Sequence, residues 1–137
     1  MMEFKHTITE VKTMATKLFN EEKAEREIAQ IFKELRLPIT TSGYRYLYSA
    51  VVKAVESIYN NDCNITNGVY KKVMEEYNAS YSSINRAMIY SIKGMYQRGN
   101  KEKLYKLISD SEKNIPPLTF IGMVAQNVYN KLSNNAE

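Results

Sequence analysis

Apolar side chains recur every three or four residues along nearly the whole chain. This spacing places them on one face of a helix, because an α-helix turns once in 3.6 residues. The pattern predicts an all-α fold class, with about six to seven helices around one core that contain a helix-turn-helix. The predicted helices span about residues 7–19, 21–36, 43–60, 68–77, 81–97, 101–109 and 118–132.

Polar and helix-breaking residues mark the ends of these segments. Asn20 precedes two acids and is typical of an N-cap, since its side chain can accept a hydrogen bond from the first helical turn. Pro38 ends the helix that starts there, because proline disfavours helical backbone in the residue before it. Ser42 and Gly43 open the next helix. The residues predicted to point inward include Ile28, Phe32, Leu47, Val51, Ile84, Met88, Phe120 and Val124.

The centre of the chain has the organisation of a helix-turn-helix. Asn67 predicts the start of the short helix 68–77, residues 78–80 form a tight turn, and Ser80 or Ser82 can cap the longer helix 81–97. Gly99 suits the end of that helix. In this motif the second helix enters the major groove of DNA by its N-terminal half. The pattern alone has low specificity, because two helices joined by a polar turn also occur in simple bundles.

Basic residues are unevenly distributed along the chain. There are 19 Lys and Arg against 15 Asp and Glu, which gives a net charge of +4. Residues 1–40 are neutral overall, and residues 81–108 contain six bases and one acid. A local basic surface attracts polyanions such as DNA. A solvated lysine-rich face is the other interpretation of this pattern.

The sequence assembles no catalytic, metal or cofactor site. The single histidine, His6, lies near the N-terminus with no Ser, Cys or Asp constellation around it. Cys63 has no Cys or His neighbour at metal-ligand spacing. Glu75 and Glu76 are adjacent, so on a helix their side chains diverge by about 100° and are best interpreted as solvated charges. We therefore expect no enzyme, no metal, no cofactor and no small-molecule substrate.

The chain also lacks the signals of a membrane or secreted protein. No apolar run approaches the roughly 18 to 20 residues that a membrane span needs. The first residues lack the continuous apolar stretch of a signal peptide, and a lone cysteine is consistent with a reducing compartment. These features predict a cytoplasmic protein without membrane contact.

Several short motifs occur together in one order. They are Leu37-Pro38, GYRYL at 43–47, Ile65-Thr66, RGN at 98–100 and FIGMVA at 120–125. Over about residues 28–128, the chain resembles the DNA-binding effector domain of the master sporulation response regulator of spore-forming Firmicutes. The resemblance implies a six-helix domain whose third and fourth helices form the helix-turn-helix and whose last helix supports dimerisation on tandem sites. We therefore expect double-stranded DNA as the partner and a homodimer through helix 118–132.

The same resemblance predicts the domain organisation. We expect an extra N-terminal helical segment at 1–27, the effector domain at 28–132 and a polar tail at 133–137. The regulators of the family carry a receiver domain with a phosphorylated aspartate, for which 137 residues leave no room. Control by phosphorylation is therefore not expected for this chain. The segment 1–27 is interpreted either as a helix packed on the domain or as an arm for a dimer or partner.

The expected DNA-reading segment, residues 78–89, departs from the family pattern. Ser82 and Arg86 match the family. Arginine, glutamate, arginine and histidine of the family pattern are replaced by Ser83, Asn85, Ile89 and Tyr90, respectively. Arginine binds guanine through two hydrogen bonds, which serine and isoleucine cannot reproduce, so we expect an altered or weakened base preference. Asn85 could pair with adenine, and Ile89 could contact a thymine methyl group.

Two functional hypotheses follow. The first is a DNA-binding transcriptional regulator that reads the major groove with helix 81–97. Its expected base contacts are Ser82, Ser83, Asn85, Arg86 and Ile89, and its expected phosphate contacts are Lys71, Lys72, Tyr90, Lys93, Arg98 and Lys101. The alternative is a non-catalytic protein-interaction module or antagonist that kept the fold but lost specific base reading, which the apolar Tyr81 and Ile89 favour. Only DNA binding should weaken steeply with salt.

Overall fold

The computed structural model describes residues 19–62, 65–99, 102–103, 106 and 115–135. Their helices are α2 (Glu21–Leu35), α3 (Ser42–Tyr59), α4 (Ile65–Tyr77), α5 (Tyr81–Arg98) and α7 (Pro117–Asn135). These residues contain no strand, which confirms the all-α fold class. The predicted count of six to seven helices is not matched, since the described part of the chain forms five. Helix 7–19 and most of helix 101–109 fall outside the described residues.

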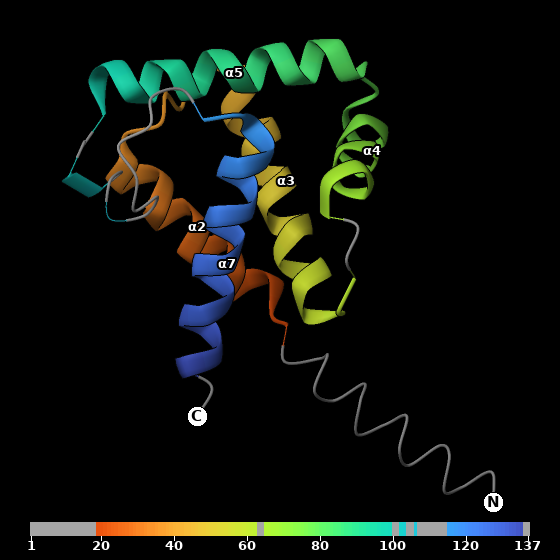
Figure 1. The fold of residues 1–137 in the computed structure, drawn as a ribbon, viewed down its shortest axis with the longest axis vertical. Helices are drawn as coiled ribbons and strands as arrows, with labels where there is room; N and C mark the ends of the chain where they lie inside the picture. The colour runs from red at the N-terminus through yellow and green to blue at the C-terminus, as the bar shows by residue number, and fades with distance from the viewer. Residues whose placement is uncertain (1–18, 63–64, 100–101, 104–105, 107–114, 136–137) are drawn as a thin grey trace, which may run out of the picture.

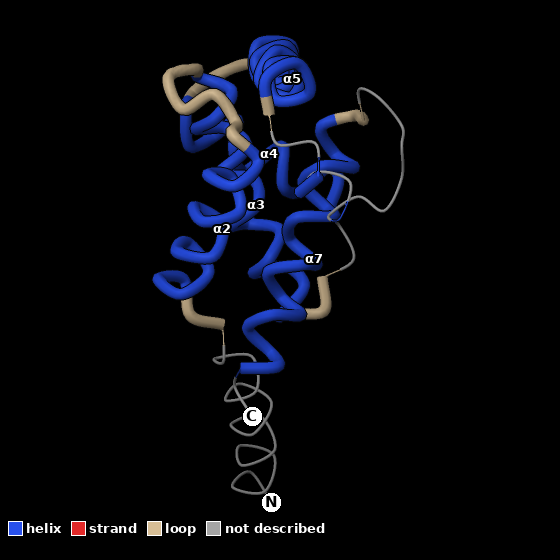
Figure 2. The backbone as a smooth tube through the Cα atoms, turned by 90° about the vertical axis from the view of Figure 1, so that its left-hand side faces the viewer, coloured by secondary structure: helices blue, strands red, loops and turns tan. Residues whose placement is uncertain are grey.

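Three helices form a bundle, and α5 lies across one end of it (Figure 1). The bundle consists of α2, α3 and α7, each packed against the other two. α4 packs on the side of α3 and leads directly into α5. Figure 2 looks along α5 and shows it at the end of the molecule opposite the C-terminus. The arrangement leaves the outer side of α5 facing away from the bundle.

The core lies where the apolar faces of these helices meet. Its largest fully buried side chains are Phe32, Phe120, Ile28, Leu35, Leu47, Ile84, Met88, Ile92, Met95, Ile121 and Val51. The eight inward-facing residues named above from the helical spacing are all buried. The inner side of α5 contributes Ile84, Met88 and Ile92 to this core. Because burial of these apolar side chains is favourable, it determines which side of α5 faces solvent.

Polar caps define where three of the helices begin. The Asn20 side chain accepts a hydrogen bond from the Lys23 backbone N–H at 3.1 Å, as predicted. Thr41 caps α3 by accepting from the Tyr44 N–H at 3.3 Å, one residue before the predicted opening. Ser80 rather than Ser82 caps α5. The prediction that Asn67 starts the helix at 68–77 is wrong, because that helix, α4, begins at Ile65.

The described helix ends do not use glycine in a left-handed conformation, which is the usual reason for a glycine such as Gly99 at a helix end. The backbone is left-handed at Arg36, Asn61 and Asn78, with φ of 58°, 56° and 49°, and at no glycine of the described residues. Gly99 caps α5 with an extended backbone, φ −83°. A Cβ on Gly99 would overlap the carbonyl oxygens of Met95 and Leu35. Close approach of α2 to the end of α5, rather than a left-handed turn, therefore explains the glycine.

Candidate nucleic-acid interface

A tight turn joins α4 to α5. Asn78 adopts the left-handed backbone that asparagine tolerates, and the Ala79 N–H donates to the Met74 carbonyl at 3.1 Å, which closes the end of α4. The Ser80 hydroxyl oxygen accepts from the Ser83 N–H at 3.2 Å and starts α5. These local bonds build the short helix, turn and longer helix of a helix-turn-helix.

Direct backbone packing holds α5 on α3. A Cβ on Gly43 of α3 would overlap the carbonyl oxygen of Ala87 and the Ser91 hydroxyl on α5. The hydroxyls of Thr41 and Ser91 form a hydrogen bond of 2.6 Å beside this contact. Because Ser91 is fully buried, this bond satisfies a polar group that would otherwise destabilise the interface. The helix is thus fixed in height and rotation on the bundle.

A polar cluster fixes α4 on the other side of α3. The Glu76 carboxylate accepts hydrogen bonds from the Lys53 ammonium, at 2.8 Å, and from the Ser49 hydroxyl. These two bonds lower the pKa of Glu76, the Lys53 bond contributing most. The sequence-based interpretation of Glu76 as a purely solvated charge is therefore wrong, since the residue bridges two helices. Glu75 is exposed, as expected.

The outer face of α5 presents most of the predicted base-reading residues. Ser82, Ser83 and Arg86 are exposed, and Ile89 and Tyr90 retain 47% and 64% of their accessible surface. Successive residues on a helix are about 100° apart. Ser82, Arg86, Ile89 and Lys93 consequently share one stripe, with Ser83 and Tyr90 on its flank.

Asn85 differs from the other predicted base-reading residues in its burial. It is half-buried rather than exposed, at the edge of the outer face. The Tyr70 hydroxyl on α4 donates a hydrogen bond to its amide oxygen at 2.9 Å. Tyr70 itself is 3% exposed, and its ring lies 5.0 Å from that of Tyr81, between centroids. Tyr70 could not be predicted as a site residue, because nothing in the helical spacing indicates a contact across the turn.

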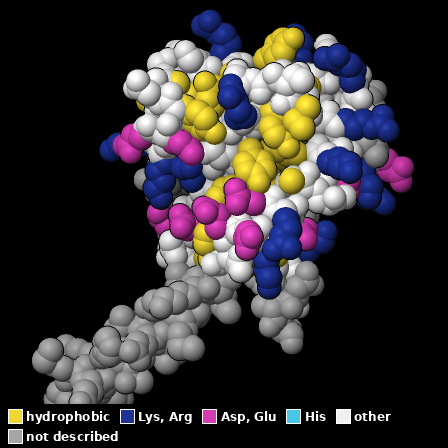
Figure 3. Space-filling model, turned by 180° about the vertical axis from the view of Figure 1, so that it is seen from behind, with side chains coloured by type: hydrophobic (Ala, Val, Ile, Leu, Met, Phe, Trp, Pro, Cys, Tyr) yellow, Lys and Arg dark blue, Asp and Glu magenta, His cyan; other side chains and the backbone are white. Residues whose placement is uncertain are grey.

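The predicted phosphate-binding side chains surround the same face. Lys71 and Lys72 are exposed on α4, and Lys93 and Arg98 are exposed on α5. Lys101, like His6 and Cys63, falls outside the described residues. The sequence of α5 contains three bases and no acid. Seen from behind in Figure 3, the upper end of the molecule, where α5 lies, carries basic side chains, and acidic side chains gather in a band below it.

Comparison with known families identifies this arrangement. Residues 28–128, well over half of the chain, match the family model described as the sporulation initiation factor Spo0A C-terminal domain. The chain belongs to this family. Its resemblance to the sporulation regulator is thereby confirmed, and the Spo0A C-terminal family is one of DNA-binding effector domains that regulate transcription in sporulation. The match spans all of α3, α4 and α5 and most of α2 and α7.

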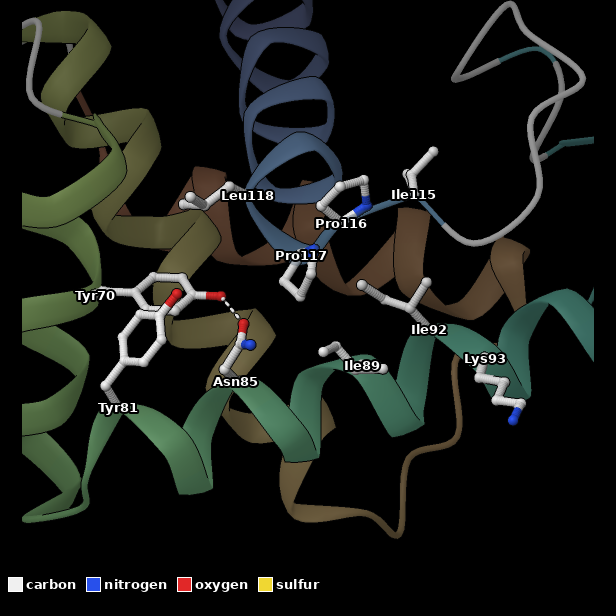
Figure 4. Close-up of a pocket in the computed structure, with 10 residues that line it drawn as sticks. All are labelled: Tyr70, Tyr81, Asn85, Ile89, Ile92, Lys93, Ile115, Pro116, Pro117 and Leu118. Carbon is white, nitrogen blue, oxygen red and sulfur yellow. Dashed lines mark hydrogen bonds between the residues drawn. The ribbon is translucent and has the colours of Figure 1, made fainter.

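Two grooves flank α5 in this member of the Spo0A C-terminal family. One, of about 490 Å³, lies between α5, α4 and the start of α7 (Figure 4). Its lining residues are Tyr70, Tyr81, Asn85, Ile89, Ile92, Lys93, Ile115, Pro116, Pro117 and Leu118. The other, of about 530 Å³, runs between the start of α3 and the opposite side of α5, and Arg86 and Tyr90 contribute to it. The first groove is largely apolar, and Lys93 is the one charged side chain among the described residues that line it.

The described ranges contain neither a metal-ligand cluster nor a membrane-spanning helix. Among these residues no group of three or more His, Cys, Asp or Glu side chains could hold a metal ion. None of the helices in the same ranges is long and apolar enough to cross a membrane.

Proposed function

We propose that this protein is a transcriptional regulator that inserts the outer face of α5 into the major groove of double-stranded DNA. One observation carries the proposal: the outer face of α5 is exposed and carries Arg86 and Lys93, and the helix contains no acid. A helix with a free basic face fits the groove by shape and attracts the phosphates by charge.

The roles of the individual side chains follow from their position on that face. Residues near the start of α5 would contact base edges: Ser82, Ser83, Asn85, Arg86 and Ile89. Residues on the flanks would bind phosphates and set the register: Lys71, Lys72, Tyr90, Lys93, Arg98 and Lys101. Arg86 is the strongest candidate for guanine, because a guanidinium can donate two parallel hydrogen bonds to it. With the chromosome as target, we place the protein in the cytoplasm.

We also propose that the protein binds as a homodimer through α7. The apolar side of this helix is already used, since Phe120, Val124 and Val128 are fully buried in the core. A second copy would therefore contact the opposite side, where Thr119, Gln126 and Asn130 are exposed. Two copies on tandem sites would double the number of phosphate contacts, and with it the salt dependence. The domain boundaries at 27/28 and 132/133 stay predictions. Each lies within a continuous helix, the first in α2 and the second in α7.

A pair of arginine variants tests the proposal. Binding to labelled duplexes is titrated at two salt concentrations for the wild type, Arg86→Ala and Arg26→Ala. Arg26 is also an exposed arginine, on α2, so it controls for loss of a positive charge. We expect Arg86→Ala to weaken binding by about 1–3 kcal/mol and Arg26→Ala to have little effect. Equal effects of the two variants would contradict the proposed interface.

The groove in Figure 4 favours a second candidate function, binding of a partner protein. Tyr81 and Ile89 are 51% and 47% exposed and both line this groove. Because Lys93 contributes a positive charge to an otherwise apolar set of described lining residues, the occupant would be an apolar segment with an acidic residue placed to meet Lys93. This candidate predicts no DNA binding at low salt. It also predicts an association that changes little with salt, since burial of apolar surface is not screened.

A further inference from the structure

The contact between Tyr70 and Asn85 links the two helices of the helix-turn-helix at a predicted base-reading position. Tyr70 lies on α4 and Asn85 lies one turn into α5. Figure 4 shows the hydroxyl and the amide oxygen facing each other across the 2.9 Å hydrogen bond. The ring of Tyr81 packs against that of Tyr70 in a tilted arrangement, and Tyr70 is only 3% exposed. Packing therefore fixes the position of the Tyr70 hydroxyl, which can in turn fix the orientation of the Asn85 amide.

The direction of this hydrogen bond determines what Asn85 can offer to DNA. Burial raises the pKa of Tyr70 to about 12, so the hydroxyl keeps its proton at neutral pH. A phenol O–H that donates to the amide oxygen occupies one of its two lone pairs and turns that oxygen toward α4, while both N–H groups of the amide nitrogen take no part in the bond. In Figure 4 the amide nitrogen is outside the bond to Tyr70.

We propose that Tyr70 is a positioning residue that holds the Asn85 amide oxygen toward α4, so that Asn85 meets base edges with its N–H groups. The inference rests on the proposed function, and it deepens it by naming the class of base that the position recognises. An asparagine reads adenine by accepting from N6 and donating to N7 at the same time. With its oxygen held by Tyr70, Asn85 matches edges that present acceptors, namely N7 and O6 of guanine or O4 of thymine. The expected preference is therefore guanine or thymine, in place of the adenine that the residue type alone suggests.

Selection from random duplexes, followed by sequencing, tests the assignment. Five proteins are compared: the wild type, Tyr70→Phe, Asn85→Ala, the double variant and Tyr48→Phe. Tyr48→Phe is the matched control, because the Tyr48 hydroxyl also donates one hydrogen bond, to the Glu25 carbonyl on α2 at 3.2 Å. Removing either hydroxyl keeps the ring and its packing, so both variants should fold.

The proposal predicts one base position whose preference depends on both residues. Asn85→Ala should reduce the discrimination there by about two- to tenfold, the size of one net hydrogen bond. Tyr70→Phe should change the preferred base or admit adenine at that position alone, Tyr48→Phe should match the wild type, and the double variant should equal Asn85→Ala.

Three results would overturn the assignment. Tyr70→Phe could give the wild-type motif while Asn85→Ala changes it, which leaves the proposed function intact and removes the role of Tyr70. The wild type could prefer adenine at the position that Asn85 controls, or Asn85→Ala could leave every position unchanged. Absence of any enriched motif for the wild type would instead remove sequence reading itself, and the salt titration of the wild type would then show whether DNA binding remains.

Discussion

Gly43 on α3 and Ala87 on α5 are in direct backbone contact, and a Cβ on Gly43 would overlap the Ala87 carbonyl oxygen. No other residue type allows the two helices to approach this closely. The buried Ser91 hydroxyl, which bonds to Thr41, lies at the same point. The position of the proposed DNA-reading helix therefore depends on a glycine on another helix, far from it in sequence.

We expect Gly43→Ala to destabilise the protein by about 1–3 kcal/mol, because the overlap involves backbone that cannot move aside cheaply. The matched control is Gly122→Ala on α7, where a Cβ meets nothing within 4 Å. That change should stabilise by up to about 1 kcal/mol, through higher helix propensity. Urea unfolding measures the free energy of unfolding of both variants. A Gly43→Ala variant as stable as the wild type would contradict the close approach of α3 and α5.

The cluster at Glu76 predicts an acid-dependent loss of stability. Its pKa is lowered in the folded protein, chiefly by the Lys53 hydrogen bond. The contribution is therefore complete above the ordinary pKa of glutamate and is lost as the pH falls through the lowered value. Because the Glu76 side chain is 48% exposed, we expect a contribution below about 1 kcal/mol.

Glu76→Gln should remove this dependence. The free energy of unfolding is measured in urea at neutral pH and at a pH below the ordinary glutamate value. The wild type should lose more stability than Glu76→Gln over that interval. Parallel losses in the two proteins would show that the bridge between α3 and α4 makes no contribution.

Two tyrosines predict a loss of stability in alkali. Burial raises the pKa of Tyr70 and Tyr48 to about 12, from an ordinary value of 10.0. Between these values the unfolded chain loses protons that the folded chain retains, so stability is complete below pH 10 and falls as the pH rises toward 12. Between pH 10 and 12 the free energy of unfolding should fall less steeply with pH for Tyr70→Phe than for the wild type. An identical pH dependence in the two proteins would contradict the burial of the Tyr70 hydroxyl.

Lys71 on α4 predicts a phosphate contact that carries no sequence information. Lys71→Ala should weaken binding to all duplexes about equally and reduce the slope of log affinity against log salt by about one. Lys33→Ala, an exposed lysine on α2, is the control. A change in base preference without a change in slope would assign Lys71 to base reading instead.

The helical spacing was sufficient to predict the all-α fold and the buried side of each helix. Burial of Phe32 or Met88 depends on local periodicity, which the sequence displays directly. The caps at Asn20 and Ser80 were also predictable, because a cap bonds only to its own first turn. The start of α4 was not, since Ile65 carries no capping signal and Asn67 lies inside the first turn.

The candidate site was predictable only where exposure follows from the helical period. Arg86 and Ile89 lie on the outer face because the inner face is apolar. The bond between Tyr70 and Asn85 depends on the angle that the turn imposes between α4 and α5, and the glycine at 99 depends on the approach of Leu35 from α2. Both are contacts between separate helices, so they cannot be predicted from a local sequence pattern.

Selection of bound sequences from a pool of random duplexes, followed by titration of the selected duplex at two salt concentrations, tests the central claim most directly. We predict an enriched motif whose binding weakens steeply with salt, and a motif that changes when Arg86 is replaced by alanine. Salt-sensitive binding without a motif would contradict sequence reading by α5. No binding at low salt would contradict DNA binding altogether and would favour the protein partner at the apolar groove.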